Sequence, residues 1–328
     1  MNDSFDKTIS GGKFDEIFTE VSHAETLGLK NPEQLRLFHL NVNNNAFSSD
    51  KLEVFLRKNI GQYVFSRAQI ENYHVEGNVY SVGMDAIDIM KRNGAPGQKG
   101  TGNDLGEIML YVFLEQVLGA PKIMSKVELQ TGAKQYNSKC DGIHLLSLEQ
   151  TFGMPYYHMV FGTSSIVGDM KKAVDSAFDA IVEIEKQSTQ ERTLAENTVF
   201  SKSFDQDTIQ RIKDLLVPSK GPKVPCDTAY GVFLAYNLGL KAANYSGVDF
   251  RRALTQKMDT DIRNHASYIA GKINALGLDM HSFYFYILPL NDADVEKVQI
   301  MDRVMNEKSR PAEIEYDSLI WPSGVCML

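Results

Sequence analysis

Long apolar runs and paired cysteines are missing from this 328-residue sequence. No stretch reaches the roughly 18 apolar residues that a membrane-spanning helix needs, which argues against a membrane protein. The opening stretch MNDSFDKTISGGKFDEIF is polar and mixed in charge, unlike a secretory signal, so we expect a cytoplasmic protein. The three cysteines, Cys140, Cys226 and Cys326, form no CxxC pair, which argues against a disulfide framework or a zinc site.

Two common catalytic signatures are also missing. The glycine-rich stretch GAPGQKGTGN at 94–103 does not match the G-x-x-x-x-G-K-[ST] phosphate-binding loop, and no G-x-S-x-G elbow supports a serine hydrolase. The net charge of −8 opposes non-specific binding to phosphate backbones, although it leaves room for a local basic groove or a DNA-binding partner. Lys122, Lys126, Lys134 and Lys139 make one stretch locally basic, and such counts alone favour a solvated surface.

Apolar patterns predict a mixed sheet with helices against it. In the first half they predict a strand over 35–42, helices over 50–64, 83–94 and 104–119, strands over 123–131, 141–148 and 156–161, and a helix over 169–187. The helix over 104–119 is apolar on nearly all sides, which is typical of a central, buried helix. Along the chain, this helix is followed by three strands and another helix, and that order indicates an α/β (α+β) fold.

The second half begins with a polar stretch over 186–203 that is typical of a connector. The patterns then predict a helix over 205–217, a strand over 229–240, a long helix over 250–277, a strand over 281–290 and a helix over 292–307. This half is either a second lobe or a continuation of the same sheet.

Two carboxylates are candidates for a catalytic site. Asp141 begins the predicted strand DGIHLL, and Glu107 lies in the first turn of the buried helix. A hard divalent ion such as Mg²⁺ takes oxygen ligands, and one or two carboxylates with waters suffice. Each residue also has a structural interpretation, because Asp-Gly is a common turn dipeptide and Asp104 stands at capping-box spacing from Glu107.

The strand that follows departs from what a catalytic site needs. Such a strand usually carries a second acid and a lysine, whereas these places hold Thr163 and Ser165, within the stretch VFGTSSIVGD. Hydroxyl groups coordinate Mg²⁺ without bringing charge, and they also end strands by local capping. His144 shares a face with Gly142 by alternation and is interpreted as a core histidine or one that supports a site residue, with a catalytic role as the weaker alternative.

Several stretches, taken in order, resemble one protein family. They are NDLGEIMLYVFLEQVLGAPKIMSKVELQT, then CDGIHLL, then MVFG before a helix, and finally FYFYILPL, within residues 60–305. The set is similar to HamA, the nuclease-like effector subunit of the Hachiman antiphage defence system. The resemblance implies a PD-(D/E)XK nuclease-like mixed sheet, action on DNA and a superfamily 2 helicase partner, HamB.

The resemblance also implies roles for individual residues. It matches Glu107 to the helix glutamate and Asp141 to the metal-binding aspartate, with Mg²⁺ as the expected cofactor. The family's Gly-Glu-x-Lys pattern reads Gly162-Thr163-Ser164-Ser165 here, so the acid and the lysine are replaced. We therefore keep three interpretations: a nuclease effector, a non-catalytic DNA-binding or regulatory subunit of the helicase, and an unrelated protein that shares the scaffold.

The sequence patterns and the resemblance together divide the chain into four expected parts. They are an N-terminal segment over 1–60, a nuclease-like core over 61–190, a lobe or continuation over 191–308, and an extension over 309–328.

Overall fold

Seven strands pair into one mixed sheet in the computed structural model, which describes residues 7–9, 12–93, 103–132, 139–153, 156–194 and 226–306. In hydrogen-bonded order they are β1 (Phe18–Val21), β2 (Glu33–Leu40), β9 (Ser282–Leu290), β8 (Cys226–Asn237), β7 (Tyr157–Ile166), β6 (Gly142–Ser147) and β5 (Lys122–Ser125). The four strands β2, β9, β8 and β7 are parallel, and the strands beyond them are antiparallel. The predicted mixed α/β sheet is confirmed, and strands of the second half lie at its centre.

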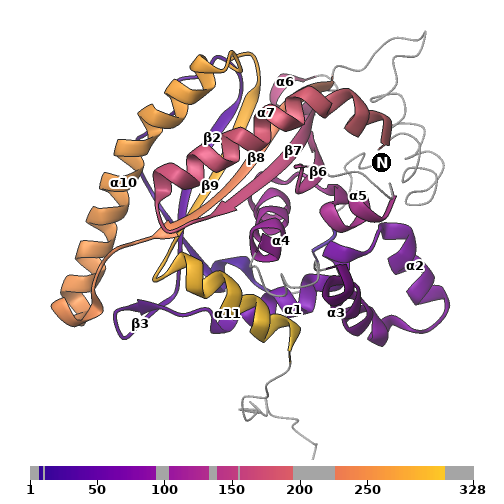
Figure 1. The fold of residues 1–328 in the computed structure, drawn as a ribbon, viewed down its shortest axis with the longest axis horizontal. Coiled ribbons are helices and arrows are strands. Elements are labelled where there is room, and N and C mark those ends of the chain that lie inside the picture. Colours follow the sequence, from indigo (N-terminus) through magenta and orange to yellow (C-terminus); the bar gives the residue numbers. More distant parts are fainter. Residues whose placement is uncertain are drawn as a thin grey trace, which may run out of the picture.

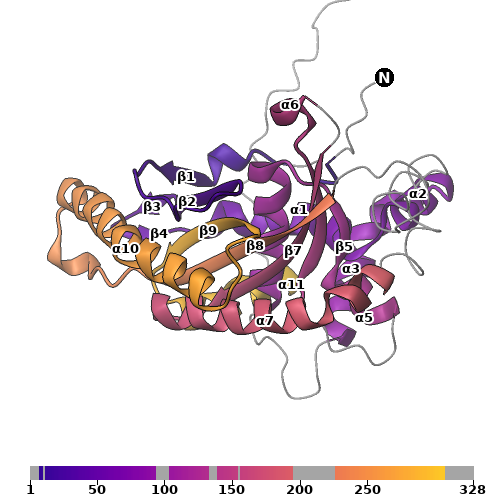
Figure 2. The same cartoon turned by 90° about the horizontal axis from the view of Figure 1, so that it is seen from above.

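Helices cover both faces of this sheet (Figure 1). Their bounds are α1 (Asp50–Val64), α2 (Arg67–Val75), α3 (Val82–Asn93), α4 (Asn103–Phe113), α5 (Lys126–Gly132), α6 (Glu149–Phe152), α7 (Met170–Leu194), α10 (Gly247–Ala275) and α11 (Ala293–Met305). A π-helical turn, Leu114–Leu118, extends α4, and a short hairpin joins β3 (Val42–Asn43) to β4 (Ala46–Phe47). Both views place α2 and α3 beside the β5 end of the sheet (Figures 1 and 2).

Alternation along the central strands separates two cores. On one face, the ring of Phe113 in α4 packs 5.5 Å from Phe233 of β8 and 5.4 Å from Tyr286 of β9, measured between ring centroids. On the other face, Phe178 of α7 packs 6.3 Å from Phe283 of β9. Successive side chains of a strand point to opposite faces of the sheet. These contacts and the strand register therefore assign each residue of β7, β8 and β9 either to the face that α4 covers or to the face that α7 covers.

Two glycines allow α4 to approach the sheet closely. A Cβ atom at Gly162 of β7 would lie 2.5 Å from Leu110 Cδ2, and one at Gly231 of β8 would lie 2.7 Å from Leu114 Cδ2. These two glycines are register partners, so the space left by their missing side chains extends across both strands. The close approach brings the first turn of α4, with Glu107, beside the ends of β6 and β7.

The structure corrects three sequence expectations. The strand expected over 123–131 ends at Ser125 because Ser125 and Glu128 form a reciprocal cap that starts α5. The strand expected to end at 161 continues to Ile166, so Thr163 and Ser165 lie inside a strand. Helix α7 continues to Leu194, where a connector was expected. The expected helix over 205–217, the loop at 94–102 and the extension over 309–328 lie outside the described residues.

Candidate functional site

A lysine joins the two candidate carboxylates. The ammonium of Lys126 lies 2.8 Å from Glu107 Oε1 and 2.9 Å from Asp141 Oδ1. Both acids are buried, with 7% and 6% of their surface exposed. The structure thus brings Glu107 and Asp141 together around a cation, and we call Glu107, Lys126 and Asp141 the ion-pair cluster.

Two hydroxyl groups hold the remaining carboxylate oxygens. Ser164 Oγ of β7 donates to Asp141 Oδ2 at 2.6 Å, and the hydroxyl of Tyr63 in α1 donates to Glu107 Oε2 at 3.1 Å. Each of the four oxygens in the cluster therefore accepts at least one hydrogen bond. This arrangement fixes the orientation of both acids.

Backbone contacts place the members of the ion-pair cluster. Lys126 is the first residue of α5, directly after β5, and its N–H donates to Asp141 O at 3.1 Å. The N–H of Asp141 donates to Gly162 O of β7 at 2.8 Å, which fixes Asp141 at the start of β6. A Cβ atom at Gly106 would lie 2.6 Å from Ser164 Oγ, so this glycine leaves the room that the serine needs.

The electrostatic balance of the cluster keeps Lys126 charged. Burial lowers the pKa of Lys126, but the charges of Asp141 and Glu107 outweigh burial and raise the pKa above its usual value. One ammonium compensates one of the two carboxylates that it contacts. The site therefore carries a net negative charge and already contains one cation, the ammonium of Lys126.

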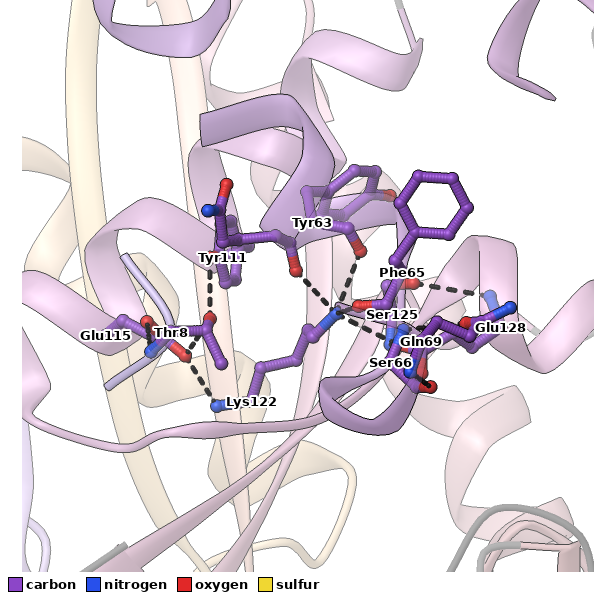
Figure 3. Close-up of polar contacts among 11 residues, drawn as sticks. Thr8, Tyr63, Phe65, Ser66, Gln69, Tyr111, Glu115, Lys122, Ser125 and Glu128 are labelled. Carbon is purple, nitrogen blue, oxygen red and sulfur yellow. Dashed lines mark hydrogen bonds and ion pairs between the residues drawn. The ribbon is translucent and has the colours of Figure 1, made fainter. Parts of the chain in front are cut away.

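A second buried lysine, Lys122, contacts the end of α1 and the first turn of α5 (Figure 3). Lys122 Nζ donates to the carbonyl oxygens of Gln62, Tyr63 and Phe65 at the end of α1, at 2.7, 3.0 and 2.9 Å, and pairs with Glu128 Oε2 at 3.0 Å. Lysine is almost never buried without such partners. Through them, Lys122 ties the helix end that carries Tyr63 to the helix that begins with Lys126.

A buried glutamate anchors the N-terminal side of this network. The carboxylate of Glu115 accepts from the N–H groups of Thr8, Ile9 and Lys122 at 2.7 to 2.9 Å, and from the Thr8 hydroxyl at 2.7 Å (Figure 3). The Thr8 hydroxyl also lies 2.7 Å from the Tyr111 hydroxyl. Residues 7–9 are thereby held against the end of α4.

Comparison with known proteins decides the family. A model of the HamA family matches residues 15–304. The chain belongs to the HamA family. HamA membership makes it an antiphage defence subunit. No curated protein matches the chain. Among its described residues, no helix is long and apolar enough to cross a membrane.

Two of the residues that the HamA resemblance selected, Thr163 and Ser165, lie on the face of the sheet opposite the ion-pair cluster. Thr163 and Ser165 are the register partners of Val232 and Leu234, on the face that α7 covers, and both are buried. Ser164 between them faces α4 and contacts Asp141. The structure brings Glu107 and Asp141 together, and it does not bring Thr163 or Ser165 to them.

Sequence reasoning missed Lys126 and Tyr63. The basic stretch was interpreted as a solvated surface, which is wrong for Lys122, at 2% exposed, and for Lys126, which pairs with two acids. Lys139 is exposed, and Lys134 lies outside the described residues. The one available signal was the Ser125-x-x-Glu128 cap, which turns the following lysine out of the strand.

His144 is a buried histidine of the core. Its Nδ1 bonds to Ala120 O at 2.8 Å, and burial lowers its pKa to about 4, as expected of a neutral core histidine. Asp141 forms the ladder contact with β7 and not the expected turn. Among the described residues, no three His, Cys, Asp or Glu side chains gather to hold a metal.

Proposed function

We propose that this HamA-family protein is the nuclease-fold effector of its defence complex, hydrolysing phosphodiester bonds in DNA with a helicase partner. The single observation that carries the proposal is the position of Lys126. The ammonium that β7 does not supply comes instead from the β5–α5 junction and contacts both buried acids. The sequence of α4, three antiparallel strands β5, β6 and β7, then α7 and β8 supports the nuclease-like assignment.

The donor set suits a hard divalent ion. Mg²⁺ is usually held by one or two carboxylates, with waters and substrate phosphates completing its shell. Glu107 and Asp141 would hold it, and Ser164 adds a neutral oxygen on the same side. Bound there, the ion would polarise the phosphodiester and supply a hydroxide nucleophile.

The chain's own residues have distinct roles in this proposal. Ser164 and Tyr63 orient the two carboxylates by donating to their outer oxygens. Lys126 stays protonated and stabilises the negative charge that develops on the phosphate during displacement. The overall charge of −8 favours delivery of DNA by the partner over capture of DNA from solution.

A second candidate is a non-catalytic subunit that binds DNA or regulates the helicase. One observation favours it: at the end of β7 the residues that face α4 are Gly162, Ser164 and Ile166, none of which is acidic. A site with two carboxylates in place of three retains fewer fixed charges for metal binding.

Cleavage by the reconstituted complex separates the two candidates. The chain is mixed with its helicase partner, ATP, Mg²⁺ and labelled duplex DNA, beside Asp141→Asn, Lys126→Met and a chelator control. Asp259→Asn, which alters a half-exposed acid of α10, is the matched control. The proposal predicts that both site variants lose on the order of 100-fold or more in rate while Asp259→Asn does not. Equal rates for wild type and Asp141→Asn, or no cleavage despite a stable complex that binds DNA, would refute hydrolysis at this site.

A further inference from the structure

The ion-pair cluster contains no carboxylate oxygen without a donor. Lys126 takes the inner oxygen of each acid, and Ser164 and Tyr63 take the outer ones. We propose that Lys126 closes this site to divalent ions in the DNA-free protein, and that a DNA phosphate opens it by drawing the ammonium away. The inference rests on the proposed function, because it concerns the same two acids.

The first step of the argument is competition for the same oxygens. Lys126 bonds Glu107 Oε1 at 2.8 Å and Asp141 Oδ1 at 2.9 Å, so its ammonium occupies the place between the two acids where a divalent ion held by both would bind. An ammonium and a divalent ion that occupied this buried site together would repel each other strongly, because little water lies between them to screen the charges. Lys126 must therefore leave before both acids hold a metal.

The second step is which group is able to move. The side chains of Glu107 and Asp141 are 9% and 7% exposed, whereas that of Lys126 is 21% exposed. Tyr63 is fully packed within the core, at 1% exposed. Lys126 is therefore the charged member with a route to solvent, and its four-carbon stem allows the ammonium to swing while its backbone stays in place.

The third step is what draws the ammonium out. A phosphate group offers an anionic oxygen at the surface side of the cluster, and lysine pairs with phosphate as a compact point charge. When Lys126 turns to a phosphate, it vacates Glu107 Oε1 and Asp141 Oδ1 together. The consequence is an order of binding in which DNA comes first and the divalent ion second, so the subunit holds no metal until substrate is present.

Manganese binding tests this order without relying on cleavage. Free Mn²⁺ is measured by electron paramagnetic resonance with the full chain, with and without a short duplex, in wild type, Lys126→Met and Lys126→Met/Asp141→Asn. Lys171→Met is the matched control. Lys171 lies on α7, outside the cluster, and its ammonium is 5.0 Å from the centroid of the Tyr268 ring of α10. Asp141→Asn with the duplex gives the Mn²⁺ that DNA itself takes up.

The closure predicts at least a tenfold difference. Lys126→Met binds one Mn²⁺ without DNA, at least tenfold tighter than wild type and Lys171→Met, and the double variant loses this site. The duplex raises the affinity of wild type to that of Lys126→Met. Lys126→Arg, which keeps the cation, stays closed without DNA. Lys126→Gln, which removes the charge and keeps a polar side chain, binds Mn²⁺ as Lys126→Met does and replaces it if the methionine variant does not fold.

Each contrary result has a definite meaning. If DNA-free wild type binds Mn²⁺ as tightly as Lys126→Met, the closure is overturned. If Lys126→Met opens the site but the duplex does not change wild type, opening by DNA is overturned. If DNA opens wild type as predicted and no cleavage follows, the order of binding stands and the proposed hydrolysis fails.

Discussion

Replacing Lys122 by methionine is the most informative test of the buried network. Methionine has a similar length and removes the ammonium that pairs with the buried carboxylate of Glu128 and bonds the carbonyl groups at the end of α1. Removing one partner of a buried ion pair costs about 3 to 5 kcal/mol, because the other charge stays uncompensated. We expect Lys122→Met to lower the free energy of unfolding by about that amount.

A second substitution shows whether the uncompensated charge is the cause. Glu128→Gln removes the charge and keeps an acceptor for the Ser125 N–H, so the cap at the start of α5 survives. We expect Lys122→Met/Glu128→Gln to regain most of the stability that Lys122→Met loses, since buried pairs are often replaced by neutral groups at little net cost.

Urea unfolding at neutral pH measures both effects. With a slope of about 3 kcal/mol per molar urea, the midpoint of Lys122→Met falls by about 1 M or more. Arg252→Met is the control, because the Arg252–Asp249 pair is 66% and 55% exposed and such pairs contribute about 1 kcal/mol or less. A Lys122→Met midpoint equal to that of Arg252→Met would refute the reasoning, as would a double variant no more stable than the single one.

Two further predictions concern packing and pH. Gly106→Ala should lower stability by about 1 to 3 kcal/mol, because its Cβ would meet Ser164 Oγ at 2.6 Å, whereas Gly271→Ala in α10, with no atom within 4 Å, should raise it by about 0.5 to 1 kcal/mol. Thermal unfolding of the two variants compares them, and equal shifts would contradict the tight contact. Burial lowers the pKa of His144 to about 4 from its usual 6.5, so the unfolded chain binds more protons between these values and stability falls as pH falls from 6.5 to 4. In urea unfolding, His144→Gln should lose less stability than wild type between pH 7 and 5. An equal loss in the two proteins would contradict the prediction. The pKa of His158 is also lowered to about 4, so His158 accounts for the pH dependence that remains in the variant.

The elements that sequence patterns predicted well are the ones with dense apolar residues. The helix expected over 104–119 and the strand over 281–290 match α4 with its π-helical turn and β9 closely, because both are buried almost all round. The boundary between β5 and α5 was not predictable from apolar residues, since Ile123, Val127 and Leu129 keep an alternating spacing across it. A capping box, a local polar contact, decides it.

The candidate site was only half predictable for a geometric reason. Glu107 and Asp141 stand out as acids within apolar stretches, which sequence shows directly. Whether Thr163 or Ser164 faces them depends on strand register, and a shift of one residue moves every side chain to the other face. Tyr63 comes from a distant helix that approaches only in the folded chain. No local pattern contains that information.

The pairing of β2 with β9 sets when the sheet is completed during synthesis of the chain. Glu33 pairs with Phe283, so a strand made early waits for one made near the end of the described chain. Helix α11, at Ala293–Met305, is made later still and packs against α4. Such distant contacts form late and slowly. On the ribosome, a nascent chain therefore carries Glu107, Asp141 and Lys126 well before β9, at the centre of the sheet, has been made.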